Sequence, residues 1–230
     1  MSPALKKVAP DLWVADRPLR LPFILGDIGC RMTIVRLAGG GLFLHSPVPL
    51  DPDTRTLLNE IGPVRAIVAP SRAHHLFVGD YVKAYPATKL HGAPGLPEKR
   101  KDLKFDAILG DHADPDWQGQ IEQHLFGGAP ILNEVVFFHP ASRTVIFTDL
   151  IFNVPPEDAS RMRVFNWLTG AAGHFGPHRL IRRMISERNA ARASVEKILQ
   201  WHFDRVIVSH GKVLDSGGGD PVRAAFSYLW

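Results

Sequence analysis

The sequence VRAIVAPSRAHH, residues 64–75, is the stretch from which the rest of the chain can be interpreted. Residues 64–69 form an apolar run broken only by Arg65, which is typical of a buried strand. Pro70 ends that strand because proline has no N–H to donate to a neighbouring strand. Two adjacent histidines follow shortly afterwards. Layered α/β folds gather their ligands in the loops after strand C-termini, so this segment predicts a functional site.

Two later strands end in residues of the same chemical kind. The strand at 144–148 runs into Asp149, and the strand at 205–209 runs into His210. Imidazole and carboxylate groups bind metals and transfer protons. Taken singly, an aspartate at a strand end often only caps a turn. Three strands that all end this way favour one shared site.

A predicted β-hairpin adds a second carboxylate. Two apolar runs, 134–138 and 145–147, flank a short turn. Pairing the last residue of the first run with the first residue of the second places Glu134 opposite Asp149. Two carboxylates that close repel each other unless a cation or a shared proton lies between them. His139 lies at the other end of the hairpin and is excluded from the site.

The order of the predicted elements indicates an α/β fold. Short strands come first, at 12–15, 31–37 and 42–45, and later strands alternate with helices. The segment 179–202 has apolar residues at helical spacing, so we expect one amphipathic helix packed on a sheet. This order predicts sheets covered by helices on their outer faces. We interpret residues 1–230 as a single domain.

The segment 155–176 has no clear periodicity and contains several glycines. A loop of this length inside a compact domain is often a lid or a binding loop. It would line or cover a pocket, or else form a packed loop with surface histidines. The side chains concerned are Phe165, Trp167, His174 and His178.

Composition excludes several classes of protein. The 230 residues are 45% hydrophobic and 22% charged, as in ordinary globular proteins. No run approaches the ~18 apolar residues of a membrane helix, and the N-terminus lacks the apolar segment of a secretory signal. Cys30 is the only cysteine, which excludes an internal disulfide and a cysteine-based metal site. We therefore expect a cytoplasmic protein with no membrane partner.

The net charge of +4 is mildly basic, and arginines are concentrated between Arg161 and Arg192. An arginine-rich helix can bind phosphates, but such a run is more often a solvated helix face. No zinc-finger spacing, aromatic RNA-binding box or Gly-rich phosphate loop accompanies it. We therefore expect no nucleic-acid partner, and the sequence leaves the oligomeric state open.

The chain resembles the metallo-β-lactamase superfamily over nearly its whole length. Phe147-Thr148-Asp149 is similar to the superfamily's aspartate element, and Val208-Ser209-His210-Gly211 is similar to its last histidine element. The first element, His-x-His-x-Asp-His, is matched when His74 takes the aspartate position and His75 the closing histidine position. The resemblance implies an αββα sandwich, in which two mixed sheets pack together and helices cover the outer faces.

The resemblance also implies which metal position is retained. Pro70 and Arg72 stand where the two leading histidines belong, and residues 127–133 contain no histidine where a distant one belongs. In the superfamily those three ligands make one metal position, and the remaining ligands make the second. The chain is therefore expected to have lost the first position and to keep a degenerate form of the second.

Within the superfamily, the chain more specifically resembles a divergent, uncharacterised branch, domain of unknown function family 4336. Several short motifs carry it, and they imply a fold but no substrate. These motifs are Arg31-Met32-Thr33, Leu44-His45-Ser46-Pro47, Ala69-Pro70 with His74-His75-Leu76-Phe77, and Phe147-Thr148-Asp149-Leu150 with Asn153.

These residues predict a metal-dependent hydrolase with one metal ion and an unknown small-molecule substrate. Such ligands suit a divalent ion, zinc first, with iron or manganese as alternatives. A divalent ion acidifies a bound water, and Glu134 would act as general base or orient that water. Arg72 would hold an anionic group such as a carboxylate or a phosphate. The expected metal ligands are His74, His75, Asp149 and His210.

Two alternatives stay open. A metal-free scaffold would keep the same residues as a hydrogen-bonded cluster and bind a small molecule without turnover. A single iron ion held by histidine and carboxylate would instead perform redox chemistry. Four protein ligands also leave little room for water, which is closer to a structural site than to a catalytic one. Metal content and metal identity separate these possibilities.

Overall fold

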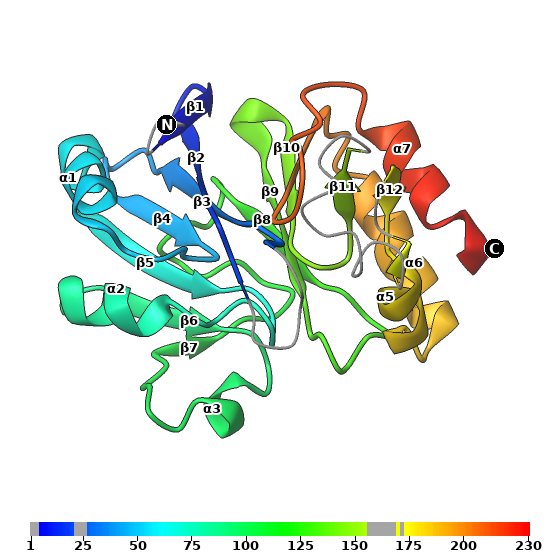
Figure 1. Ribbon diagram of the computed structural model, residues 1–230, viewed down its shortest axis with the longest axis horizontal. Helices are drawn as coiled ribbons and strands as arrows, with labels where there is room; N and C mark the ends of the chain where they lie inside the picture. The colour runs from blue at the N-terminus through cyan, green and yellow to red at the C-terminus, as the bar shows by residue number, and fades with distance from the viewer. Residues whose placement is uncertain (1–4, 21–26, 156–168, 171–172) are drawn as a thin grey trace.

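A computed structural model of the chain describes residues 5–20, 27–155, 169–170 and 173–230. Two main β-sheets pack against each other, and helices cover the face of each sheet that points away from the other (Figure 1). The first sheet is antiparallel from β1 to β4 and parallel from β4 to β7. Its strands, in spatial order, are β1 (Lys6–Ala9), β2 (Leu12–Arg17), β3 (Cys30–Arg36), β4 (Leu42–His45), β5 (Val64–Ala69), β6 (Lys89–Gly92) and β7 (Ala107–Ile108).

The second sheet is also mixed. Its inner strands are antiparallel, and β10 pairs with β13 in parallel. Its strands, in spatial order, are β13 (Arg205–Val208), β10 (Thr144–Phe147), β9 (Val135–His139) and β8 (Glu122–Leu125). A separate antiparallel pair consists of β11 (Phe152–Val154) and β12 (His174–Gly176).

Apolar side chains from both sheets fill the space between them. Phe43 of the first sheet lies 5.5 Å, ring to ring, from Phe137 of the second and 5.0 Å from Trp117. Val68 and Ile207 belong to the same buried cluster. Burying this much apolar surface on both inner faces is what holds the two sheets together.

The outer faces carry the helices. Leu58 and Tyr81 pack on the first sheet, and Ile181, Val195 and Val222 pack on the second. The helices of the first sheet are α1 (Pro52–Ile61), α2 (Val78–Ala84) and α3 (Leu96–Lys99), and those of the second are α5 (Arg179–Met184), α6 (Arg188–Leu199) and α7 (Gly219–Ala225). Two short 3-10 helices are η1 (Pro140–Ser142) and η3 (Ser227–Leu229). No helix in these described segments is both long and apolar enough to cross a membrane. The arrangement confirms the predicted αββα sandwich.

The predicted hairpin register is confirmed. Val145 pairs with Phe138, although η1 forms the turn between the two strands. Arg143 closes that turn with φ at 49°, in the left-handed region. Because the register is the expected one, Glu134 and Asp149 leave the two strands at the same end.

The predicted single helix over 179–202 is wrong in one respect, because the chain forms two helices there. The break falls at 185–187, and the N–H groups of Ser186 and Glu187 donate to the Gly128 carbonyl instead of continuing the helix. Helical spacing alone does not reveal a break whose hydrogen bonds go to a distant loop. Most of the expected lid over 155–176 lies outside the described residues.

Candidate metal centre

Three strands from both sheets bring their C-terminal ends together. Asp149 follows shortly after β10, and His210 follows shortly after β13. These two strands are parallel, so both residues leave the second sheet at one edge. His74 comes from the turn after β5 in the first sheet. The candidate site therefore bridges the two layers at their shared edge.

Asp149 lies between two histidines. His74 Nε2 is 3.3 Å from Asp149 Oδ2, and His210 Nε2 is 3.4 Å from Asp149 Oδ1. The potential ligand atoms of the three residues all lie within 4.8 Å of one another. Their side chains are only 9%, 12% and 4% exposed for His74, Asp149 and His210. Buried charges at this spacing interact strongly because little water screens them.

The far nitrogen of each imidazole is held by a neighbour. His74 Nδ1 lies 2.7 Å from Ser46 Oγ, and His210 Nδ1 lies 2.9 Å from the Gly29 carbonyl oxygen. A carbonyl oxygen can only accept, so His210 Nδ1 carries a proton and donates it to Gly29. Histidines that bind metals are usually fixed in this way.

Glu134 holds the backbone around Asp149. It is fully buried, and its two oxygens accept from the N–H groups of Thr148 at 2.7 Å, Asp149 at 2.8 Å and Leu150 at 3.0 Å. Burial and the nearby Asp149 charge raise the pKa of Glu134 to about 7, against the effect of the Thr148 donors. The carboxylate thus fixes the turn that presents Asp149.

The charges in the cluster favour a deprotonated Asp149. Burial by itself would raise the pKa of this carboxyl, but His74 and His210 outweigh it and hold the pKa far below its ordinary value. Burial lowers the pKa of His74, yet Asp149 and then Glu134 reverse that effect and raise it. Asp149 Oδ2 is buried, and among the described residues it faces His74 Nε2 at 3.3 Å without the geometry of a hydrogen bond. A buried carboxylate oxygen in that position is suited to a cation.

The structure does not bring His75 into this group. Its Nδ1 lies 3.1 Å from Arg100 Nη1, and the same Nη1 donates to the His75 carbonyl at 2.8 Å. Burial, together with Lys99 and Arg100, lowers the pKa of His75 to about 4. The ring lines the same hollow as His74, but its Nδ1 faces an arginine. Adjacent residues after a strand point in different directions, which the sequence pattern could not resolve.

Arg72 also turns away from the cluster. Its Nη1 donates to the Pro130 carbonyl at 3.5 Å, and its side chain lies against Gly95. Its own carbonyl accepts from Lys99 at 2.7 Å. Arg72 does not line the hollow beside His74, so its expected contact with an anionic group stays a prediction.

A hollow of about 110 Å³ opens beside the cluster, and His74, His75, Asp149 and His210 all border it. Its other walls are mostly apolar, and Leu76 at the rim is 48% exposed. Ligand sites commonly combine such walls with a few converging polar groups. The remaining lining residues are Leu19, Ile28, Cys30, Ser46, Pro47, Ala73 and Phe77.

Comparison with known proteins identifies the family of the chain. A profile described as a domain of unknown function, DUF4336, matches residues 11–169. The chain belongs to the DUF4336 family. No functionally curated protein matches the chain.

Solved structures similar to this DUF4336 protein are metallo-β-lactamases, and they share its fold. One from Pontibacter korlensis is 15% identical, with 98% of this chain and 97% of that chain covered and a TM-score of 0.67. One from Erythrobacter litoralis is 14% identical, with coverage of 98% and 95% and a TM-score of 0.68. One from Pseudomonas aeruginosa, in its mono-zinc form, is 13% identical, with coverage of 98% and 92% and a TM-score of 0.65.

His178 is a neighbour of the DUF4336 site that the sequence suggested only weakly. It is 4% exposed and its ring lies 4.5 Å from Phe152, which stacks on His210 at 4.9 Å. Burial lowers the pKa of His178 to about 4, and Asp149 opposes this effect. His178 begins α5, where its Nδ1 accepts from the Ile181 N–H, and Phe165 and Trp167 lie outside the described residues.

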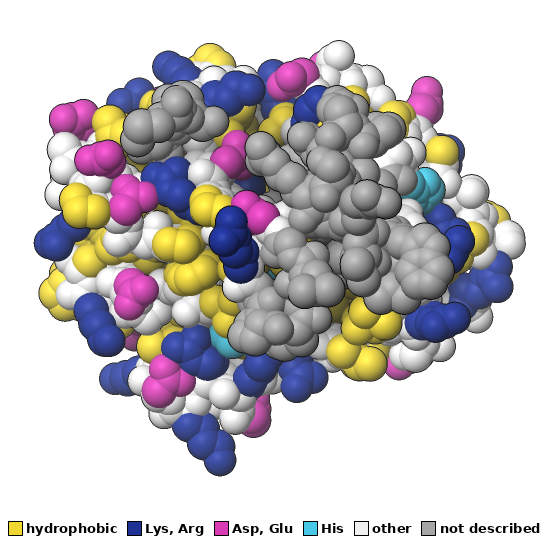
Figure 2. Space-filling model, viewed as in Figure 1, with side chains coloured by type: hydrophobic (Ala, Val, Ile, Leu, Met, Phe, Trp, Pro, Cys, Tyr) yellow, Lys and Arg dark blue, Asp and Glu magenta, His cyan; other side chains and the backbone are white. Residues whose placement is uncertain are grey.

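The arginine run of this DUF4336 protein lies over α5 and α6, where Lys and Arg side chains gather at the right edge of Figure 2. Several of these arginines have partners within the protein. Arg182 lies over the Tyr228 ring, Arg192 lies over Trp230 and pairs with Glu196, and Arg188 donates to the Tyr228 carbonyl. These contacts tie the end of the chain to α5 and α6.

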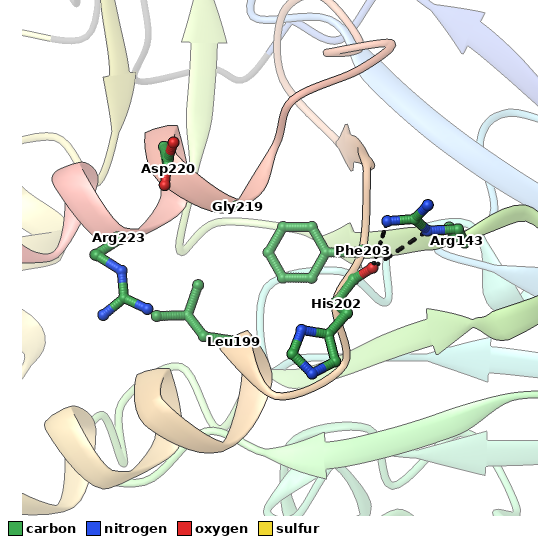
Figure 3. Close-up of a pocket in the computed structure, with 7 residues that line it drawn as sticks. All are labelled: Arg143, Leu199, His202, Phe203, Gly219, Asp220 and Arg223. Atoms are coloured by element: carbon green, nitrogen blue, oxygen red, sulfur yellow. Dashed lines mark hydrogen bonds between the residues drawn. The ribbon is translucent and has the colours of Figure 1, made fainter.

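A larger hollow, of about 270 Å³, lies near the starts of β10 and β13, whereas Asp149 and His210 follow the ends of these strands (Figure 3). Arg143 and Arg223 lie on two sides of it. The Arg143 guanidinium already donates to the His202 carbonyl through Nε and Nη2. His202 and Asp220 line this hollow, but neither belongs to a group of described residues close enough together to hold a metal ion.

Proposed function

We propose that the protein is a metal-dependent hydrolase with a single metal ion held by His74, Asp149 and His210. The observation that carries the proposal is the convergence of two Nε2 atoms on the two oxygens of one buried carboxylate, at 3.3 and 3.4 Å. Two imidazoles and one carboxylate are a ligand set that zinc accepts.

The surroundings of the ligands also fit a metal. The Nδ1 atoms face Ser46 Oγ and the Gly29 carbonyl, so both Nε2 atoms point inward. Glu134 holds the backbone of Asp149 through buried hydrogen bonds. Each ligand therefore has an outer contact that fixes its orientation, as in established metal sites.

Three protein ligands suit catalysis better than four. His75 faces Arg100, so one coordination position is left for water or substrate. When bound, a divalent ion at these ligands would lower the pKa of a water molecule toward ~7 and so supply a nucleophile near neutral pH. Asp149 and the two histidines would orient the ion, and the apolar walls of the hollow would exclude bulk water from the substrate.

Glu134 has a positioning role in this proposal. Its oxygens are occupied by backbone N–H groups, which leaves no geometry for taking a proton from a substrate. The imidazole of His75 borders the hollow and is the nearer candidate for contact with a substrate. The substrate would be a small molecule that places an apolar group against Ile28, Pro47 and Phe77.

Two histidines with one carboxylate are also the ligand set of mononuclear iron enzymes that use oxygen. This observation favours a redox enzyme as the second candidate. A metal-free scaffold is the third, since His74 and Asp149 would form an ion pair without any metal. The bound metal decides among the three.

The proposed hydrolase is tested with protein loaded separately with zinc, iron or manganese and given chromogenic esters, thioesters, phosphodiesters and lactams. We expect hydrolysis of at least one class, lost in Asp149→Asn and His210→Ala and retained in His112→Ala, whose side chain is exposed and does not border the hollow beside His74. Metal-bound protein that hydrolyses none of these but consumes oxygen with iron would overturn the hydrolase in favour of the redox enzyme.

A further inference from the structure

A second group, of one histidine and two aspartates, lies beside β6 in the parallel half of the first sheet. His91 belongs to β6, and Asp114 and Asp116 come from the segment between β7 and β8. The potential ligand atoms of these three residues all lie within 4.8 Å of one another. None of them belongs to the candidate centre described above.

His91 is a buried imidazole. Its side chain is 0% exposed, and neither ring nitrogen has a hydrogen-bond partner among the residues that the structure describes. The ring packs edge-on against Trp117 with centroids 4.6 Å apart. Nδ1 lies 3.7 Å from Asp114 Oδ2, which is too far for a hydrogen bond. Burial of polar groups without partners is costly, so a missing partner is expected there.

The charge around His91 is suited to a cation. Asp114 and Asp116 are 18% and 34% exposed, so both carboxylates lie at the protein surface above the buried ring. Among the described residues, Lys89 is the one lysine that pairs with either carboxylate, its Nζ lying 2.8 Å from Asp116 Oδ2. Lys89 and Asp116 border a hollow of about 370 Å³, which gives an ion a path from solvent.

We propose that His91, Asp114 and Asp116 bind one divalent transition-metal cation. One imidazole and two carboxylates suit zinc or manganese, and the remaining positions are open to water. The ion would join the loop that carries the two aspartates to β6 and would take the place of the Lys89 ammonium on Asp116. This inference stands apart from the proposed hydrolase, because it uses none of the same residues.

The first test counts bound metal by elemental mass spectrometry after incubation with zinc or with manganese alone. We expect Asp114→Asn and Asp116→Asn each to bind one equivalent less than the parent chain, while Asp53→Asn, an exposed aspartate in the first turn of α1, binds the same amount. Circular dichroism checks that every variant is folded. Equal metal content in the parent and both variants would overturn the proposal.

The two metal groups are distinguished by combining variants. If the proposed hydrolase site fails to bind metal, His210→Ala changes nothing and the equivalent lost in Asp114→Asn is the whole content. If both groups bind, the two substitutions each remove one equivalent and together remove both.

Lys89→Met gives a second test with the opposite sign. The ammonium competes with the ion for Asp116, so its removal is expected to tighten binding of manganese about tenfold, by titration in the His210→Ala background. A structural ion pair alone predicts no tightening. Unchanged or weaker binding in Lys89→Met would overturn the competition and with it the proposed site.

Discussion

The two histidine-aspartate groups of this protein are held in different ways. In the first, Asp149 and its two histidines each have an outer partner, and all three come from strand ends that the two sheets fix. In the second, His91 has no hydrogen bond, and its two aspartates lie on one loop. Outer contacts fix the direction of a ligand and are typical of sites that perform chemistry. The first group is therefore suited to catalysis, and the second to fixing a loop.

The carboxylates of the two groups also differ in how far they are exposed to solvent. Asp149 is 12% exposed, whereas Asp116 is 34% exposed and already paired with Lys89. A cation at Asp149 would be shielded from water, where electrostatic interactions are strong. A cation at Asp116 would exchange with solvent more readily. Substitutions near each carboxylate can therefore distinguish the two environments.

Glu134→Ala is expected to have the largest effect on stability. It leaves the N–H groups of Thr148, Asp149 and Leu150 buried without acceptors, which costs about 3 kcal/mol or more in the free energy of unfolding. Urea denaturation of chelator-treated protein measures the loss. Glu122→Ala, at an exposed position of β8, is the control. Stability equal to that of the parent would mean that Glu134 does not hold the first group in place.

His45 tests how a buried imidazole without carboxylates behaves. It is 1% exposed, and its ring nitrogens have no hydrogen-bond partner in the described part of the chain. Burial, then the nearby His74, lower its pKa to about 3. Below pH ~6.5 the unfolded state takes up a proton that the folded state does not, so stability falls as pH falls from 6.5 toward 3.

We expect this group to contribute a slope of about 1.4 kcal/mol per pH unit in that window. His45→Leu removes the contribution, and urea denaturation of both proteins between pH 6.5 and 4.5 measures the difference in slope. Parallel stability profiles for the parent and His45→Leu would contradict a buried, neutral His45.

Ser46→Ala tests the contact that orients the His74 ring. Loss of the hydroxyl 2.7 Å from His74 Nδ1 frees the ring to turn, so metal affinity at the first group is expected to fall about tenfold. Competition with a chelator in the Asp114→Asn background measures this affinity. Ser186→Ala, an exposed serine between α5 and α6, is the matched control, and equal affinity in both variants would remove Ser46 from the site.

Arg72→Met is expected to have the smallest effect. Because Arg72 turns toward Pro130, metal affinity at the first group should change by no more than about 0.5 kcal/mol, or roughly twofold. The same chelator competition measures it. A large gain in affinity would show that the guanidinium charge acts on the cluster after all, and would extend the first group toward Arg72.

The sequence predicted the parts of the site that depend on strand ends. Asp149 and His210 follow apolar strands, and the hairpin register by itself places Glu134 beside Asp149. Side-chain direction within a turn was not predictable, so His75 was grouped with His74 although it faces Arg100. Ser46 was noted only inside a family motif, because a serine after a strand has no distinctive pattern.

The second group was not predicted at all. His91 lies within a short strand, and its aspartates come from the segment between β7 and β8. Spacing in sequence says little about residues that meet only when a loop folds back on a sheet edge. Conversely, the αββα sandwich followed from the order of the elements and from the family resemblance, because both depend on the whole chain.

The central claim is most directly tested by metal content in the Asp114→Asn background, where only the first group remains. Elemental mass spectrometry compares that protein with the same chain carrying His210→Ala or His75→Ala. We predict one equivalent of metal in the background protein, none after His210→Ala, and one after His75→Ala, because His75 Nδ1 faces Arg100. Metal retained in His210→Ala, or lost equally in His75→Ala, would contradict a site built from His74, Asp149 and His210.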